Sequence, residues 1–234
     1  MISVVMPAFN EADFLEPAVR EVVDGLSARG LDGEVVVVEN GSTDATAEIA
    51  RGLAGSVPGV RAVTLPRPDY GAALRAGFLA ARGDVVANVD VDYYDLDFVE
   101  ATAAMLTAEG GPDVVVGSKR AAGADDQRSA LRRLITSLFA LVLRRGFGLR
   151  VSDTHGMKAM KRATVLPVVE RCRLGTDLFD TELVLRAERA GLGVTEVPVT
   201  VRESRPSRTS ILRRGLRTVR GLVVLRLALR ADRV

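Results

Sequence analysis

The sequence predicts an α/β protein in which helices cover both faces of a mostly parallel sheet. Short, almost continuously apolar segments alternate with segments of helical periodicity along most of the chain, and this alternation is typical of consecutive βαβ units. The apolar segments lack the polar alternation of half-exposed strands, as expected for parallel strands buried on both faces. Right-handed crossovers between such strands produce a doubly wound sandwich.

The predicted strands are short runs rich in valine. The first, residues 2–6, ends at Pro7, and the second, residues 35–38, ends at a polar turn that begins with Glu39. Their length favours strands over buried helices. The remaining predicted strands lie at 60–65, 84–89, 113–117 and 194–201.

The predicted helices carry apolar residues three and four positions apart. The first covers residues 11–28, and the second covers 42–53. Ser42, Thr43 and Asp44 favour a helix start, because their side-chain oxygens can accept hydrogen bonds from the free N–H groups of the first turn. The other predicted helices lie at 71–81, 98–108, 129–145, 177–190 and 210–230.

The composition excludes several classes of protein. With 234 residues, 47% hydrophobic and 26% charged, the chain fits one globular domain with a short appendage. Cys172 and His155 are the only cysteine and histidine, which excludes an intrachain disulfide, a cysteine-based zinc cluster and a multi-histidine metal site. The absence of tryptophan and the 4% of aromatic residues do not favour a nucleic-acid partner. The chain enters an apolar strand at once, without a basic leader, so we expect a cytoplasmic location.

The net charge of +2 hides a basic C-terminus. Residues 202–234 contain ten arginines against two acidic residues, and the rest of the chain is net acidic. We therefore predict a main domain at 1–202 and a basic helical tail at 203–234. The tail can pack on the domain through Leu212, Leu216 and Val219. Alternatively, it can lie on anionic lipid at the inner membrane face with residues 222–225 inserted.

Polar residues follow three of the predicted strands, where an α/β sheet binds its ligands. They are the segments 7–11, 39–42 and 90–92. Asp90 and Asp92 are two carboxylates separated by one residue, and they can face one hard cation whose other ligands are substrate phosphates. No G-x-G-x-x-G follows the first strand and no G-x-x-x-x-G-K-[ST] occurs, which argues against a dinucleotide-dependent enzyme and a P-loop NTPase.

Seven segments together carry a family resemblance. They are VVMPAFNEADFL, VVVVENGSTDAT, DYGAALRAGF, NVDVD, VVGSK, SDTHGMKAMKR and FDTELVLRAERAGLGVTEVPV. In this order they resemble the family 2 glycosyltransferases, which have the GT-A fold, a Rossmann-like sheet between helices. The chain is most similar to the dolichol-phosphate or polyprenol-phosphate sugar transferase branch. The resemblance implies an inverting enzyme that uses Mg²⁺ or Mn²⁺ to transfer a sugar from a nucleotide diphosphate.

The resemblance also implies roles for individual residues. The donor nucleotide would contact Pro7, Ala8, Asn10, Glu11, Glu39, Gly71, Asp90 and Val91. The metal would be bound by Asp90 and Asp92. The acceptor phosphate would contact Lys119, Arg133, Ser137, His155 and Lys158. The catalytic residues would be Asp92, through the metal, and Asp180 or Glu182, one of which would serve a hydroxyl acceptor as its base.

The chain departs from the family pattern at several points. Asp69 stands where Asn is frequent, and the segment DTHGMK is one residue shorter than the familiar form. The usual Asp-Asp of the second motif is Glu39-Asn40, Tyr94 replaces a common Gln after the metal motif, and no C-terminal transmembrane helices follow. These departures leave three functions open. The favoured one is transfer from a UDP- or GDP-linked sugar to a polyprenyl phosphate. Transfer to a soluble small-molecule hydroxyl and nucleotide binding without catalysis are the alternatives.

Several candidate site residues also have a structural interpretation. Arg133 flanks the apolar segment 134–143, which is too short to cross a bilayer and fits a core or interfacial helix. Glu182 can pair with Arg186 four residues later, as a surface contact. His155 can be an ordinary loop histidine.

Overall fold

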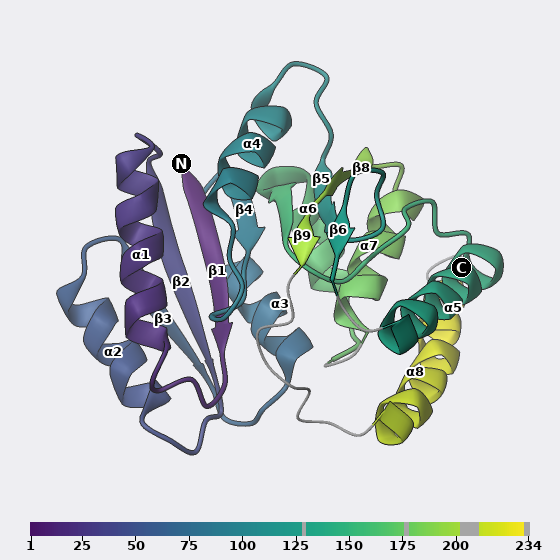
Figure 1. Cartoon of the computed structure of the whole chain (residues 1–234), viewed down its shortest axis with the longest axis horizontal. Coiled ribbons are helices and arrows are strands. Elements are labelled where there is room, and N and C mark those ends of the chain that lie inside the picture. Colours follow the sequence, from purple (N-terminus) through teal and green to yellow (C-terminus); the bar gives the residue numbers. More distant parts are fainter. Residues whose placement is uncertain (128–129, 176–177, 202–210, 232–234) are drawn as a thin grey trace.

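The computed structural model describes residues 1–127, 130–175, 178–201 and 211–231, which form a seven-stranded sheet with helices on both faces (Figure 1). The strand order is β3-β2-β1-β4-β7-β5-β8. The strands of this sheet are β1 (Ile2–Ala8), β2 (Gly33–Asn40), β3 (Val60–Leu65), β4 (Val85–Asn88), β5 (Val114–Ser118), β7 (Lys158–Lys161) and β8 (Val194–Pro198). A separate parallel pair joins β6 (Asp125–Asp126) to β9 (Thr200–Val201).

Helices connect most of the strands. They are α1 (Leu15–Ala28), α2 (Thr46–Ser56), α3 (Tyr70–Ala80), α4 (Leu96–Thr107), α5 (Ala130–Phe147), α6 (Arg162–Arg171), α7 (Phe179–Arg189) and α8 (Ile211–Ala231). The neighbours β3-β2, β2-β1, β1-β4 and β5-β8 are parallel, and only β7 runs antiparallel to its neighbours β4 and β5. The predicted α/β class with a mostly parallel sheet is therefore confirmed. The sequence did not predict β7 or α6.

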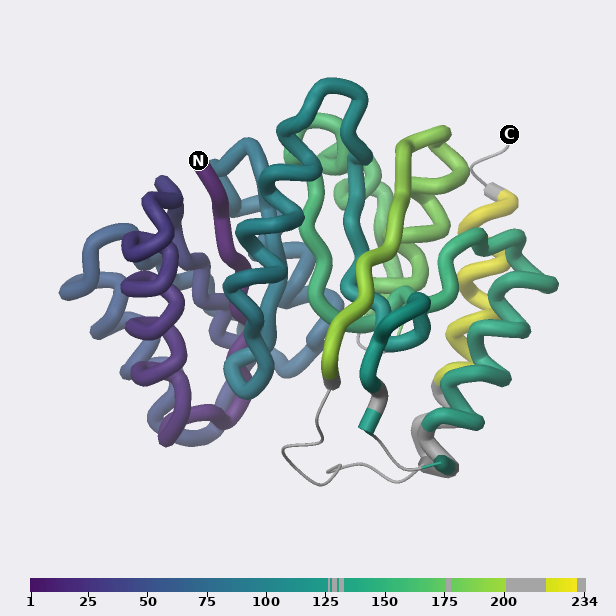
Figure 2. Tube along the Cα trace, turned by 45° about the horizontal axis from the view of Figure 1, so that its top comes forward, coloured from purple at the N-terminus to yellow at the C-terminus, as the bar shows by residue number. Residues whose placement is uncertain are grey.

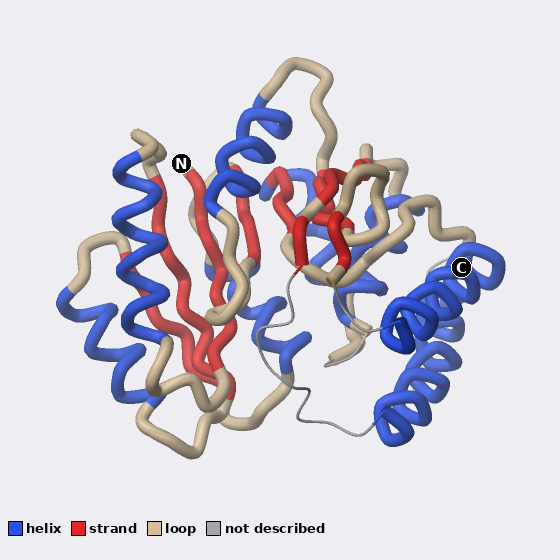
Figure 3. Tube along the Cα trace, viewed as in Figure 1, coloured by secondary structure: helices blue, strands red, loops and turns tan. Residues whose placement is uncertain are grey.

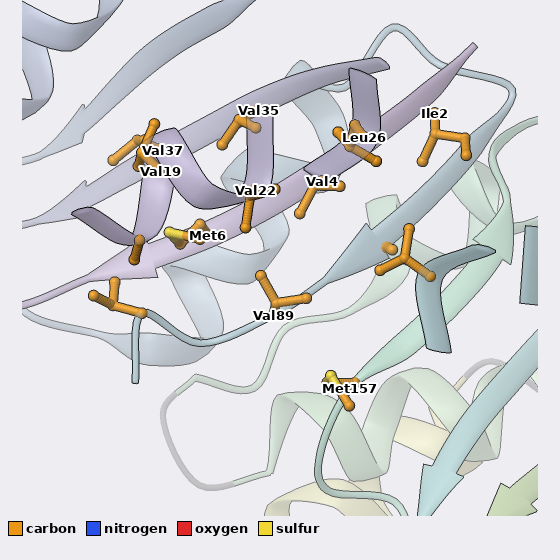
Figure 4. Close-up of a cluster of buried hydrophobic side chains, with 14 of the residues drawn as sticks. Ile2, Val4, Met6, Val19, Val22, Leu26, Val35, Val37, Val89 and Met157 are labelled. Carbon is orange, nitrogen blue, oxygen red and sulfur yellow. The ribbon is translucent and has the colours of Figure 1, made fainter. Parts of the chain in front are cut away.

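Each face of the sheet has its own apolar core. Val35 and Val37 of β2 belong to the cluster beneath α1, whereas Val36 and Val38 belong to the cluster on the opposite face. Figure 4 shows the first cluster, where side chains of β1, β2 and α1 point toward one another. Burial on both faces explains why the strands read as unbroken apolar runs.

The loops that follow β1, β2 and β3 gather at one edge of the sheet, at the bottom of Figure 3. The loops after parallel strands meet there because parallel strands all end on the same side. This edge carries the first two polar segments singled out in the sequence.

Helices α5 and α8 lie side by side at the far end of the molecule (Figures 1 and 2). Leu143 of α5 and Leu225 of α8 are buried in the same cluster. Val219 is instead exposed, which contradicts its predicted packing on the domain, and Leu225 is buried, which contradicts its predicted insertion into lipid. The side chains of Leu212 and Leu216 lie outside the described part of the chain. Within the described part, no helix is both long enough and apolar enough to span a membrane.

Candidate active site

The loops after β1 and β2 are tied together by side-chain hydrogen bonds. Asn10 has a φ of 54°, a left-handed conformation that asparagine tolerates better than most residues. Its Oδ1 accepts a hydrogen bond from the Thr43 N–H at 2.8 Å, and its own N–H donates to Ser42 Oγ at 3.1 Å. The Glu11 N–H donates to Thr46 Oγ1 at 2.8 Å. Asn10 and Glu11 thus shape the predicted nucleotide pocket by joining its two loops.

Glu39 and Asn40 at the end of β2 are buried rather than open to solvent. Glu39 Oε1 accepts a hydrogen bond from the Ser42 N–H at 2.5 Å, and Asn40 Oδ1 accepts one from the Asp69 N–H at 2.8 Å. The two side chains therefore hold the turn after β2 and connect it to the start of α3. Pro7 and Ala8 lie within β1 and are also buried.

Gly71 in the first turn of α3 is buried under α7. A Cβ atom at this position would lie 2.6 Å from the Phe179 Cβ and 2.7 Å from the carbonyl carbon of Gly175. Packing between α3 and α7 thus accounts for the glycine without a nucleotide contact. Its predicted contact with the donor stays a prediction.

The segment after β4 forms a compact acidic turn. The Asp90 N–H donates to the Tyr93 carbonyl at 3.0 Å, and the Tyr93 N–H donates back to the Asp90 carbonyl at 3.2 Å. The side chain of Val91 is buried in the core beneath α1. Val91 thus anchors the turn between the two carboxylates, so its own side chain serves packing.

Asp90 is held by a tyrosine. The Tyr70 hydroxyl donates to Asp90 Oδ1 at 2.9 Å. Burial raises the pKa of Asp90 to about 6, and the charges of Asp92 and Asp180 add to this, while the Tyr70 hydrogen bond and Lys158 oppose it. The pKa of Tyr70 is raised by burial and by the charges of Asp90 and Asp180. Burial is the largest of these effects, so the surroundings of Asp90 disfavour its charged form.

Asp180 and Lys158 form a buried ion pair next to this turn. Lys158 Nζ donates to Asp180 Oδ1 at 2.7 Å and to the Gly156 carbonyl at 2.8 Å. The lysine side chain is fully buried and the aspartate nearly so. This geometry speaks against the predicted contact between Lys158 and an acceptor phosphate, because its ammonium already faces a carboxylate inside the protein.

Lys119, Asp153 and His155 make a second polar group. Lys119 Nζ lies 3.6 Å from Asp153 Oδ2, and Asp153 Oδ1 accepts a hydrogen bond from the His155 N–H at 3.0 Å. Burial lowers the pKa of His155, while the charges of Asp180 and Asp153 act in the opposite direction. The charge of Asp180 acts on both Asp90 and His155, so the acidic turn and this group share the influence of one carboxylate.

Helix α5 borders the same group. The ring of Phe139 meets the His155 ring edge-on, with centroids 5.8 Å apart. Ser137 Oγ accepts a hydrogen bond from Arg120 Nη1 at 2.7 Å, and Arg133 is exposed one turn earlier. The sequence pattern did not point to Arg120 or Phe139 as site residues. The adjacency of Arg120 to Lys119 was the one available signal.

Both carboxylate oxygens of Glu182 accept hydrogen bonds from neighbouring residues. It is fully buried, and its Oε2 accepts hydrogen bonds from the N–H groups of Arg173 and Leu174 at 2.9 and 2.7 Å. Its Oε1 accepts one from Arg186 Nε at 2.8 Å. The predicted pair with Arg186 is present, but it is buried rather than at the surface. Oε2 thus holds the loop before α7 and Oε1 pairs with Arg186 of α7, which favours a structural role over that of a base.

The acidic turn fits a hard divalent cation. Among the described residues, no group of three or more histidine, cysteine or acidic side chains is arranged to hold a metal ion. Asp90 and Asp92 nevertheless supply oxygen donors, and a bound cation would stabilise the charged form of Asp90 that burial disfavours. Such a pair suits Mg²⁺ or Mn²⁺ when a bound phosphate supplies further oxygen ligands.

The fold and the acidic turn define a glycosyltransferase of GT-A type, a sheet of mostly parallel strands with an Asp-x-Asp pair beyond a central strand. Residues 3–166 match the family described as glycosyl transferase family 2. The chain therefore belongs to this family, and the predicted family is confirmed.

Two relatives illustrate the similarity in sequence. One, named undecaprenyl-phosphate 4-deoxy-4-formamido-L-arabinose transferase, from Pseudomonas fluorescens, is 32% identical over 85% of this chain and 56% of its own length. Another, named dolichyl-phosphate beta-glucosyltransferase, from Trichomonas vaginalis, is 30% identical over 88% of this chain and 65% of its own length. The chain thus spans a little over half to about two thirds of these relatives.

A solved enzyme illustrates the similarity in structure. Glucosyl-3-phosphoglycerate synthase from Mycobacterium tuberculosis, in complex with Mn²⁺ and UDP-glucose, aligns with a TM-score of 0.65 at 25% identity and covers 96% of this chain and 78% of its own. A complex of the same synthase with Mn²⁺, UDP-glucose and phosphoglyceric acid aligns with a TM-score of 0.61 at 27% identity. This alignment covers 88% of the present chain and 73% of the synthase chain.

Proposed function

We propose that the chain is an inverting, metal-dependent transferase that moves a sugar from a nucleotide diphosphate to a polyprenyl phosphate. The observation that supports the donor half is the half-buried carboxylate of Asp90, which accepts a hydrogen bond from Tyr70 and whose pKa is raised by desolvation to about 6. The names of the two polyprenyl-phosphate and dolichyl-phosphate relatives support the acceptor half. The synthase complexes with Mn²⁺ and UDP-glucose favour a UDP-linked donor and a divalent metal.

The reaction exchanges one C–O bond for another at the anomeric carbon. An oxygen of the acceptor forms the new bond from the face opposite the diphosphate, and the nucleotide diphosphate leaves with the electron pair of the old bond. A metal held by Asp90 and Asp92 would supply positive charge near that leaving group. Tyr70 fixes one oxygen of Asp90, which orients the carboxylate for this role.

The chain's own residues would position the acceptor. A phosphate acceptor is already ionised at neutral pH and needs no general base. Its charge calls for cations, and we assign this role to Lys119 and Arg120 together with Arg133 and the neighbouring Ser137. The Lys158–Asp180 ion pair would fix the carboxylate between the donor and acceptor sides. Such an acceptor is anchored in a bilayer, so we also propose that the chain works at the cytoplasmic face of a membrane, with its C-terminal helix in contact.

A soluble acceptor is the second candidate. The synthase complex with phosphoglyceric acid supports it. A hydroxyl acceptor needs a base within hydrogen-bond reach, and we assign this role to Asp180, whose Oδ1 is fixed by Lys158 and whose charge acts on His155.

Thermal unfolding with UDP, GDP and TDP, with and without Mn²⁺, tests the donor half. A ligand at 100 times its dissociation constant adds about 2.7 kcal/mol, roughly 5–10 °C for a chain of this size. We expect a metal-dependent shift with one nucleotide and its loss in Asp92→Ala. If no nucleotide shifts the midpoint, the proposed donor site is wrong. Transfer from the sugar nucleotide to polyprenyl phosphate in detergent, against transfer to a soluble phosphorylated hydroxy acid, then separates the two acceptors.

A further inference from the structure

Exposed apolar side chains concentrate on α5 and α8. Nine of the twelve large hydrophobic residues that are exposed in the described part of the chain lie on these two helices. They are Leu134, Ile135, Leu138, Leu141 and Val142 on α5, and Val219, Val223, Val224 and Leu227 on α8. Leu134 and Val219 are 66% and 63% exposed. An apolar surface gathered on adjacent elements indicates a docking surface, whereas single exposed residues do not.

The two helices form one layer. Leu143 of α5 and Leu225 and Leu229 of α8 point into the same core cluster, and Arg226 Nη1 donates to the Gly146 carbonyl at 3.3 Å. The helices run side by side in both Figure 1 and Figure 2. Because their inner sides share one cluster, their outer sides adjoin. We call the outer side, with its nine exposed apolar residues, the α5–α8 face.

The charges around this face are all of one sign. Arg144 and Arg145 are exposed at the end of α5, and Arg220, Arg226 and Arg230 are exposed on α8. Neither helix contains an aspartate or a glutamate. The α5–α8 face thus combines apolar side chains with arginines, the only charged residue type on its two helices.

This combination decides between two occupants. A second copy of the chain would bring the arginines of both copies together with no carboxylate on either helix to pair with them, and such like-charge contacts disfavour association. An anionic bilayer surface accepts both parts of the face, because leucine side chains enter the acyl boundary while arginines meet the head groups.

We propose that the α5–α8 face docks on the surface of an anionic bilayer, with both helices lying along it. The polar group of Lys119, Asp153 and His155, which we assign to the acceptor side, adjoins α5, since Phe139 of this helix contacts the His155 ring. Docking would therefore bring Lys119 and His155 close to the head-group region. The inference rests on the proposed function for the membrane-bound acceptor. The exposed apolar side chains and arginines of α5 and α8 favour a bilayer whether or not the chain is a transferase.

Co-sedimentation with vesicles tests the inference. The full chain is mixed with vesicles of phosphatidylcholine alone or of phosphatidylcholine with phosphatidylglycerol. We expect binding that is stronger on the anionic vesicles. Leu138→Ser combined with Leu227→Ser should lower the partition coefficient roughly tenfold or more. Arg144→Gln combined with Arg145→Gln should lower it about 25-fold on anionic vesicles only, about fivefold for each charge. Arg51→Gln, an exposed arginine on α2, is the matched control and should bind like the unmodified chain.

Three results would overturn the inference. They are failure of the folded chain to bind anionic vesicles, equal binding by the α5–α8 variants, and a lipid-free dimer that Leu138→Ser dissociates. If the double leucine variant does not fold, Leu134→Ser serves in its place. The nucleotide-induced thermal shift is measured on every variant. If the unmodified chain binds anionic vesicles but shows no nucleotide-induced thermal shift, the result counts against the proposed function and not against the docking surface.

Discussion

Lys158 Nζ and Asp180 Oδ1 form an ion pair 2.7 Å long in the interior, at the point where β7 meets the start of α7. Both side chains are almost completely withdrawn from water. The pair joins a strand in the centre of the sheet to a helix that borders the acceptor group. The ion pair therefore connects the central sheet to the candidate site.

Replacement of Lys158 by methionine should unfold the chain more readily. Removing one partner of a buried pair leaves an uncompensated charge and costs about 3–5 kcal/mol. Urea unfolding at neutral pH measures the change. The double variant Lys158→Met with Asp180→Leu should recover much of the lost free energy of unfolding. If the Lys158→Met variant keeps full stability but no longer binds the acceptor, Lys158 contacts the acceptor phosphate.

Replacement of Asp90 by asparagine should stabilise the metal-free chain at neutral pH. The pKa of Asp90 is about 6 in the folded chain, above its ordinary value of 3.8, so the folded state holds this proton more tightly than the unfolded state. The carboxylate therefore destabilises the fold fully above about pH 6, and this cost disappears as the pH falls to 3.8. The gain in the Asp90→Asn unfolding midpoint should follow the same profile.

The same substitution should abolish the metal-dependent nucleotide shift, because asparagine supplies no negative charge to the cation. For the unmodified chain, Mn²⁺ binding should weaken as the pH falls through about 6, since the metal competes with the proton on Asp90. Asp32→Asn, at an exposed position before β2, is the control and should change neither property. A destabilised Asp90→Asn at pH 8 would contradict the raised pKa of Asp90.

The sequence predicted most of the fold because its buried strands are recognisable valine runs. It missed β7, whose four residues begin and end with lysine and leave only Ala159 and Met160 as an apolar signal. It also missed α6, which contains Pro167, a residue that disfavours helix interiors. The antiparallel insertion of β7 between β4 and β5 depends on pairing across the chain, which local patterns do not encode.

The candidate site could be predicted in the same uneven way. Asp90 and Asp92 were found because they directly follow a buried strand. The hydrogen bond from Tyr70 to Asp90 and the pair of Lys158 with Asp180 join residues 20 and 22 positions apart, and no spacing rule connects them. Lys158 was therefore assigned to the acceptor, although in the fold it neutralises a carboxylate.

Replacement of Glu182 by alanine should destabilise the chain by about 3–5 kcal/mol. The change removes the carboxylate that pairs with buried Arg186 and the acceptor for the N–H groups of Arg173 and Leu174. Glu170→Ala, at an exposed position on α6, should stay within about 0.5 kcal/mol of the unmodified chain. Chemical unfolding separates the two. A Glu182→Ala variant of normal stability that fails only in transfer would identify Glu182 as the base.

A pair of glycine substitutions tests whether α3 and α7 hold the site together by close approach. Gly71→Ala places a Cβ 2.6 Å from the Phe179 Cβ, and such overpacking costs about 1–3 kcal/mol. Because Tyr70 is the preceding residue and donates to Asp90, the nucleotide-induced thermal shift should decrease as well. Gly52→Ala in α2 meets no atom within 4 Å and should stabilise the helix by about 0.5–1 kcal/mol. If Gly71→Ala leaves stability unchanged and weakens only nucleotide binding, the glycine is required by the donor rather than by α7.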